Sequence, residues 1–165
     1  MSPQEPLPDA APERLAAVQT LAARLLQKSH IYGVYLTTME FTSVRQGLVV
    51  AKLPLEDKHM NSRGGIHGAV SATIIDFVTG LGIASYDLRE ATGVSLEMNV
   101  SYLGTAHAGD TVEVESKVER VGGTIAVVTV TITKIEADGG RSPVTLGRHT
   151  KYVKQAKPKD IKDKE

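Results

Sequence analysis

The residues best suited to chemistry lie in one stretch of the sequence, NSRGGIHGAVSATIIDFVTGLGIASY, which runs from Asn61 to Tyr86. A pair of glycines leads into His67, and a helix-length segment of small and apolar residues follows. A single acid, Asp76, stands in the middle of that segment. An ionised carboxylate among apolar neighbours is costly unless it is paired, hydrogen-bonded or used. Asp76 is therefore the first candidate for a catalytic residue.

The start of the same segment offers hydrogen-bond donors. Gly64, Gly65 and Gly68 let a ligand approach the backbone closely, because they carry no Cβ. The N–H groups of a first helical turn have no partner within the helix, and the helix dipole is positive there. Such a place can hold a carbonyl oxygen as negative charge develops on it, and Asn61 and His67 add side-chain donors. The structural alternatives are a simple glycine turn and a histidine that caps the helix.

The spacing of these two groups indicates how a site is assembled. Gly68 and Asp76 are eight residues apart, which corresponds to about 12 Å along a helix. Groups that act on one carbonyl carbon and on the water attacking it must lie within hydrogen-bond reach of each other. One chain cannot supply both, whereas two such helices running antiparallel across a two-fold axis can. The sequence therefore predicts a site at a dimer interface.

Composition narrows the class of protein. The chain has 165 residues, enough for one domain, and its 41% hydrophobic and 23% charged residues are typical of a soluble globular protein. Nineteen basic and nineteen acidic residues cancel, so no global field favours nucleic acid. The absence of cysteine excludes disulfides, thiol catalysis and Cys-ligated zinc. The five histidines show no His-x-x-x-His spacing, so no metal site is expected.

The ends of the sequence show no targeting signal. The start, MSPQEPLPDAAPER, lacks both the apolar stretch of a secretory signal and the Arg-rich, acid-poor character of a mitochondrial one. No apolar run is expected to span a bilayer, so we expect a cytoplasmic protein, with mitochondrial association left open. We expect a flexible segment over residues 1–11, one domain over residues 12–154, and a flexible charged tail over residues 155–165.

The hydrophobic periods predict the elements that position these residues. Residues 12–29 have the spacing of an amphipathic helix, and residues 33–55 have that of two strands joined at Arg45-Gln46-Gly47. A polar loop over residues 56–65 precedes a helix over residues 68–85. Turn signals then separate four further strands, over residues 94–103, 110–121, 124–135 and 143–153.

The order of the elements predicts the fold. In the segment DTVEVESKVERV, valines alternate with charged residues, which indicates an antiparallel sheet with one covered face. A helix that is apolar nearly all round must be enclosed, and a sheet of about six antiparallel strands curled around it is the simplest enclosure. The fold class is therefore α+β with the hotdog architecture and an extra N-terminal helix.

Several separated motifs resemble those of one family. The stretch N-x-x-x-x-I-H-G-A-V-S-A-T-I-I-D, followed by VSLEMNVSYL and LGRHTKYV, resembles the acyl-CoA thioesterases of the hotdog superfamily, in their PaaI-like branch. The resemblance covers roughly residues 33–153 in the same order. It implies hydrolysis of an acyl-CoA thioester to free acid and coenzyme A, without a cofactor other than the coenzyme A of the substrate. It also implies a homodimer, or a homotetramer built of two dimers.

The resemblance assigns a role to each candidate. Asn61 and the N–H of Gly68 would bind and polarise the thioester carbonyl, and His67 would support that end of the site. Asp76 would be the general base or would orient the nucleophilic water, and Ser95 would help to hold that water. The contacts to coenzyme A would fall on Tyr102, Arg120, Val121, Gly122, Gly123, Thr124, Ile125 and His149.

The chain departs from the family pattern at two places. Ala69 follows His67-Gly68 where the family usually has a second glycine, which adds a methyl group near the acyl path. The turn RVGGTI lacks a lysine that relatives often place there to meet a phosphate. Coenzyme A would then rely on Arg120 or on other basic residues.

Two other functions remain open at this point. The hotdog superfamily also contains hydratases and dehydratases, which need a histidine and an acid positioned for proton transfer on the acyl chain. The spacing of Asn61, His67 and Asp76 is more similar to that of the thioesterases. A non-catalytic acyl-CoA-binding protein is the third reading, but simple binding has no use for a buried carboxylate.

Overall fold

The structure is a computed structural model that describes residues 12–154. The predicted flexible segments, residues 1–11 and 155–165, lie outside the described residues. In chain order the elements are α1 (Pro12–Lys28), α2 (His30–Tyr35), β1 (Glu40–Arg45), β2 (Leu48–Pro54), the 3-10 helix η1 (Asp57–His59), α3 (Gly68–Asp87), β3 (Val94–Tyr102), β4 (Thr111–Val121), β5 (Ile125–Ile135) and β6 (Arg141–Tyr152).

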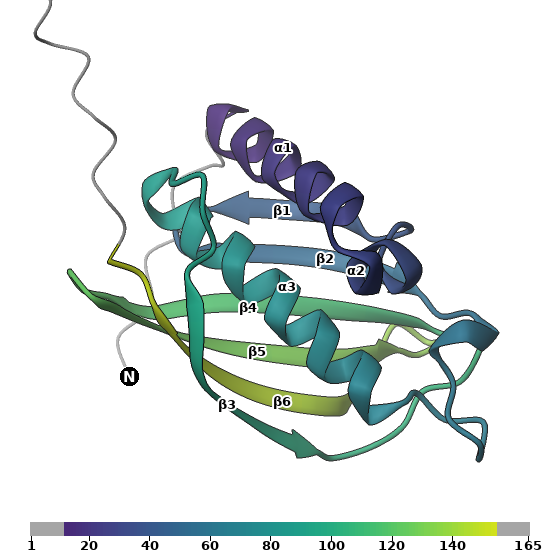
Figure 1. Ribbon diagram of the computed structural model, residues 1–165. Helices are drawn as coiled ribbons and strands as arrows, with labels where there is room; N and C mark the ends of the chain where they lie inside the picture. Colours follow the sequence, from purple (N-terminus) through teal and green to yellow (C-terminus); the bar gives the residue numbers. More distant parts are fainter. Residues whose placement is uncertain (1–11, 155–165) are drawn as a thin grey trace, which may run out of the picture.

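The six strands form one antiparallel sheet in the order β1-β2-β4-β5-β6-β3, so β1 and β3 are its two edges. Figure 1 shows α3 lying across one face of the curved sheet, with α1 beside it over β1. This arrangement confirms the predicted α+β hotdog fold with an additional N-terminal helix.

The core lies between α3 and the sheet. Ile74, Ile75 and Phe77 of α3 are at most 1% exposed, and each such side chain stabilises the fold by about 1.5–3 kcal/mol through burial. The sheet presents its inward side chains to them, and the predicted alternation is confirmed. The fully buried apolar members of β4 and β5 are Val112, Val114, Ala126, Val128, Val130 and Ile132.

Both ends of α3 are fixed. At the start, the N-cap residue His67 accepts the N–H of Ala69 through Nδ1, at 3.0 Å. At the end, Arg14 of α1 donates to the carbonyl groups of Ser85 and Tyr86. A cation is favourable there because the helix dipole is negative at its C-terminus. These contacts set the position of the residues that α3 carries.

One predicted strand begins later than expected. The alternating pattern of residues 33–44 predicts a strand, but α2 extends to Tyr35 and β1 begins at Glu40. Ser29 caps α2 by accepting the N–H of Tyr32 at 3.4 Å. A Cβ on Gly33 would lie 2.9 Å from the carbonyl oxygen of Leu26, so only glycine lets α2 turn back so closely onto α1. The cap and this close approach outweigh the strand-like period of the sequence.

The length of α3 also corrects an expectation. With 20 residues and a mean hydropathy of 1.5, α3 has the length and composition that a membrane span requires, which was not expected of any segment. However, 72% of the apolar stretch of this helix is buried inside the protein's own fold. Such burial is the usual environment of a core helix.

Candidate active site

The carboxylate of Asp76 is hydrogen-bonded on both of its oxygens. Oδ2 accepts the hydroxyl of Tyr32 at 2.6 Å. Oδ1 lies 3.2 Å from Nζ of Lys151 and 3.4 Å from the hydroxyl oxygen of Ser95. These partners come from α2, β6 and β3, and they explain how an acid can stand in an apolar helix.

The same partners set the protonation of Asp76. Burial of the carboxyl group disfavours its charged form, but the hydrogen bond from Tyr32 and the charge of Lys151 outweigh burial, so the pKa of Asp76 is lowered. Burial and the neighbouring carboxylate raise the pKa of Tyr32, which therefore stays protonated as a donor. Asp76 is thus a carboxylate at neutral pH, well suited to accept a hydrogen bond from water.

Ser95 is supported by a buried histidine. Nε2 of His149 lies 2.9 Å from the hydroxyl oxygen of Ser95, and the imidazole is fully buried. Burial and then the charge of Lys151 lower the pKa of His149 to about 4, so the ring is neutral at pH 7. Its Nδ1 lies 3.9 Å from Asp76, which is therefore not an ion pair at that pH. With the proton on Nε2, His149 donates to Ser95 and Ser95 donates to Asp76.

Asp76 and Ser95 face an open hollow between α2, α3 and β3. Its volume is about 410 Å³, which is within the range of small-molecule sites. The residues that line it are Ser29, Ile31, Tyr32, Ala72, Thr73, Asp76, Ser95 and Met98. The carboxylate, which is 33% exposed, can therefore meet a water molecule and an apolar group of a substrate in the same space.

Asn61 shapes the glycine loop before α3. Its Oδ1 accepts the N–H groups of Arg63 at 2.8 Å and of Gly65 at 3.3 Å. Its Nδ2 lies 3.4 Å from the carbonyl oxygen of Ile66. Asn61 therefore holds the loop in place and retains an amide donor beside the start of the helix.

The first turn of α3 is closely covered by Tyr102. The hydroxyl of Tyr102 donates to the carbonyl of Gly68 at 3.3 Å, and a Cβ on Gly68 would lie 3.2 Å from the tyrosine ring. A larger residue would crowd this ring. His67 is exposed and its side chain caps α3, as the structural alternative for this histidine predicts.

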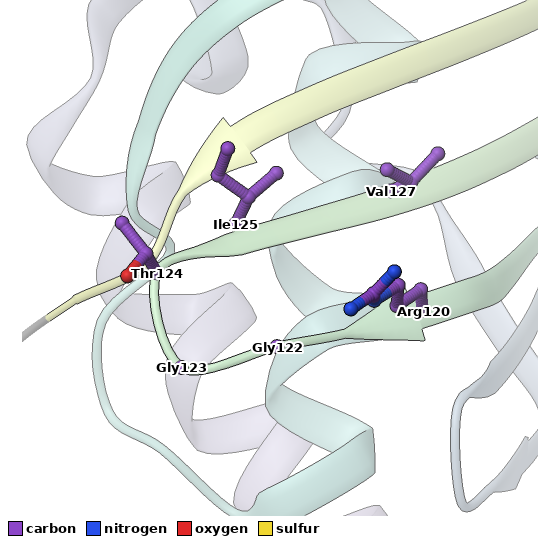
Figure 2. A pocket seen from close by; sticks show the side chains of 6 residues that line it. All are labelled: Arg120, Gly122, Gly123, Thr124, Ile125 and Val127. Atoms are coloured by element: carbon purple, nitrogen blue, oxygen red, sulfur yellow. The ribbon is translucent and has the colours of Figure 1, made fainter.

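The residues predicted to contact coenzyme A are partly brought together at the β4–β5 turn. A hollow lies there, and Figure 2 shows Arg120 on β4 beside the neighbouring strand β5, which carries Ile125 and Val127. The volume of the hollow is about 420 Å³, and Gly122, Gly123 and Thr124 complete its lining. Arg120 is exposed and can reach an anion in this hollow.

The structure separates the predicted site residues into two groups within one chain. Ser95 lies near the start of β3, where Val94 pairs with Tyr152 and the N–H of Val153 donates to Thr124 of the β4–β5 turn at 2.7 Å. Tyr102 lies at the other end of β3. Seven positions separate Ser95 from Tyr102, which corresponds to about 23 Å along a strand. One chain therefore does not unite Asp76 with Gly68.

Two residues of the site, Lys151 and Tyr32, were not predicted from the sequence. Lys151 follows His149 by two positions on β6, so both side chains face α3, and this period was a usable signal. Tyr32 lies directly before the segment 33–55 that was predicted to be strands, and nothing in the sequence marked it as a site residue. His149, for which a contact with coenzyme A is predicted, is 0% exposed and contacts Ser95.

Within residues 12–154, no group of three or more His, Asp or Glu side chains is close enough to share a metal ion.

Comparisons with known proteins give a consistent result. The sequence profile described as "Thioesterase superfamily" matches residues 63–140. Human acyl-coenzyme A thioesterase 13 is 28% identical over 130 residues, which cover 79% of this chain and 90% of that protein. The zebrafish thioesterase superfamily member 2 structure matches with a TM-score of 0.72 and 31% identity, covering 84% of this chain and 96% of that one. The structure of a hypothetical thioesterase from Streptococcus pneumoniae with coenzyme A matches with a TM-score of 0.64 and 25% identity, covering 72% of this chain and 90% of that one.

Proposed function

The chain belongs to the thioesterase superfamily and hydrolyses acyl-CoA thioesters, and we propose that Asp76 and Ser95 position the attacking water. The resemblance predicted from the sequence, to the PaaI-like branch near thioesterase superfamily member 2, is confirmed by these relatives. The observation that carries the proposal is the geometry of Asp76. An ionised carboxylate, fixed by three donors, faces an open hollow next to a serine hydroxyl.

The proposed reaction uses these groups in sequence. Water hydrogen-bonded to Asp76 and Ser95 attacks the thioester carbon, and a carbon–oxygen bond forms as one proton of the water passes to Asp76. The carbonyl oxygen becomes negative and is stabilised by the N–H of Gly68 and the amide of Asn61. The carbon–sulfur bond then breaks, and the departing coenzyme A thiolate takes the proton. A carboxylate and donors suffice for these steps, so we propose no resident cofactor.

We propose that Asp76 and Gly68 of one site come from two copies of the chain. Support comes from β3, an edge strand whose Val94, Leu96 and Tyr102 are 67%, 56% and 59% exposed. An unpaired apolar edge favours pairing with another strand. Antiparallel pairing with β3 of a second copy would bring the Tyr102 end of one strand to the Ser95 end of the other. A dimer, or two such dimers in a tetramer, would follow.

The same arrangement would unite the proposed contacts to coenzyme A. The β4–β5 turn lies at the Ser95 end of β3, the end at which Ser95 contacts Asp76. In an antiparallel dimer, the partner's Gly68 and Tyr102 would approach this end. We propose that Arg120 meets the phosphates there, while the thioester reaches Asp76.

Thiol release from a panel of acyl-CoAs of different chain length and aromatic content tests the proposed function. We expect stoichiometric formation of coenzyme A and free acid, with a preference that identifies the acyl group. Hydration of an enoyl-CoA without thiol release would favour the hydratase reading. Tight binding of acyl-CoA without either product would favour the binding protein.

A further inference from the structure

Tyr32, like Lys151, is a site residue that neither the motifs nor the family resemblance singled out. Its hydroxyl donates to Oδ2 of Asp76 at 2.6 Å, whereas Oδ1 faces Lys151 and Ser95. The two oxygens of the carboxylate therefore have separate partners. Rotation of the carboxylate would break the bond with Tyr32, so this bond keeps Oδ1 directed at the serine.

Contacts of the ring and of the backbone hold Tyr32 in position. The ring meets Phe77 of α3 edge to face, with ring centroids 5.1 Å apart and planes at 60°. The backbone N–H of Tyr32 donates to Ser29, and its carbonyl accepts the N–H of Leu36 at 2.8 Å. The hydroxyl is thus held in place before any substrate binds.

The short helix α2 is itself tied to the rest of the fold by a buried histidine. The N–H of Glu56 donates to Nδ1 of His59 at 2.8 Å, so the proton of this ring is on Nε2. Nε2 then donates to the carbonyl of Tyr35 at 2.7 Å, and the ring of His59 is 0% exposed. On the other side, Gly33 permits close contact of α2 with α1. The position of α2 is therefore specified at both of its flanks.

We propose that Tyr32 is a positioning residue for thioester hydrolysis, which holds the carboxylate of Asp76 in the orientation that lets Oδ1 and Ser95 bind the water. The N-terminal helices are then a working part of the site and not only a cover for the core. This inference rests on the proposed role of Asp76. The charged and titratable groups that face Asp76 are Tyr32 from α2, together with Lys151 and His149 from β6, beside the hydroxyl of Ser95 from β3.

Tyr32→Phe is the direct test, because it removes the hydroxyl and keeps the ring on Phe77. Tyr35→Phe, on the same helix, is the matched control. A hydrogen bond to a charged group is worth about tenfold or more in a rate constant, so we expect kcat of Tyr32→Phe to fall at least tenfold with little change in KM. The acid limb of its pH–rate profile should move to higher pH, because the pKa of Asp76 rises without this donor. Tyr35→Phe should show neither change.

A second comparison separates this inference from the proposed function. In an Asp76→Asn background, Tyr32→Phe should cost no more than twofold, because its effect requires the carboxylate. A normal kcat and an unmoved acid limb in Tyr32→Phe, alongside a slow Asp76→Asn enzyme, would overturn the role of Tyr32 alone. An equal loss from Tyr32→Phe in both backgrounds would do the same. A fast Asp76→Asn enzyme would overturn the role of Asp76 and this inference with it.

Discussion

The hydroxyl oxygen of Ser95 lies 2.9 Å from Nε2 of His149, so a fully buried imidazole is held directly behind the serine of the hollow. The imidazole is neutral at pH 7, because burial and the charge of Lys151 lower its pKa to about 4. A neutral ring can donate its Nε2 proton in a hydrogen bond to the oxygen of Ser95, and the hydroxyl of Ser95 can then donate to Asp76. Ser95 is therefore oriented by His149, and the orientation depends on the absence of a second positive charge.

Burial of a neutral His149 should make the fold sensitive to acid. An unfolded histidine takes up a proton below about pH 6.5, whereas folded His149 does so only near pH 4. The unfolded state thus binds more protons in this window, so stability falls as pH drops from 6.5 to 4, by on the order of 3 kcal/mol. Denaturant unfolding at fixed protein concentration measures this. His149→Gln should flatten the dependence, and an unchanged curve would contradict it.

Lys151 is predicted to help keep Asp76 ionised. It is 4% exposed and lies 3.2 Å from Oδ1 of that carboxylate. Lys151→Met keeps most of the side chain and removes the charge, so the pKa of Asp76 should rise and the acid limb of the pH–rate profile should move to higher pH. Lys117→Met, at an exposed position on β4, is the control. Coincident acid limbs for the two variants would exclude a role for Lys151.

Subunit complementation tests whether each site uses two copies of the chain. Asn61→Ala and Asp76→Asn should each be nearly inactive as pure proteins. If Asn61 and Asp76 of one site come from different copies, a mixed dimer has one intact site, and a random equal mixture should recover about a quarter of the wild-type sites. If both come from one chain, no mixed dimer has an intact site. Activity that stays at the level of the pure variants after mixing and refolding would refute the shared site.

Arg120 is expected to make binding of coenzyme A sensitive to salt. Ion pairs between exposed charges are screened as ionic strength rises, so KM should increase with added salt. Arg120→Gln should raise KM at low salt and weaken its dependence on salt, with kcat little changed. Arg141→Gln is a suitable control, because Arg141 pairs with Glu113 at 3.0 Å on the same sheet. Identical salt dependence in wild type and Arg120→Gln would place the phosphates elsewhere.

Much of the fold could be predicted because strong local periods governed it. The apolar surface of α3 and the alternation in β4 predicted an antiparallel sheet that encloses the helix, and the structure confirms this arrangement. The strand prediction was wrong for residues 33–39. Valine and tyrosine favour strands, but the cap at Ser29 and the close approach of Gly33 to α1 stabilise helix α2 there. Such contacts between α1 and α2 are not visible in a local pattern.

The candidate site also contains some residues that could be predicted from the sequence and others that could not. Asp76 could be found because an acid in an apolar segment contradicts its surroundings, whatever the fold. Tyr32 and the burial of His149 could not be derived in the same way, because these residues meet Asp76 or Ser95 only through packing of α2 and β6 on α3, and Lys151 had only its spacing of two positions from His149 as a signal. A tyrosine and a lysine on amphipathic elements look ordinary until the elements are assembled.

The role of Asp76 itself can be tested with Asp76→Asn, which keeps the size of the side chain and removes its charge. If Asp76 positions and activates the water, turnover should fall by about two to four orders of magnitude, the usual contribution of a positioned general base. KM should change little, because the substitution leaves Gly68, Asn61 and the hollow at Arg120 untouched. If Asp76 only satisfies Tyr32 and Lys151, the variant should lose stability and keep its turnover per folded molecule. Thermal midpoint and single-turnover rate on the same sample separate the two outcomes. A folded Asp76→Asn enzyme that turns over at a near wild-type rate would remove the carboxylate from the mechanism.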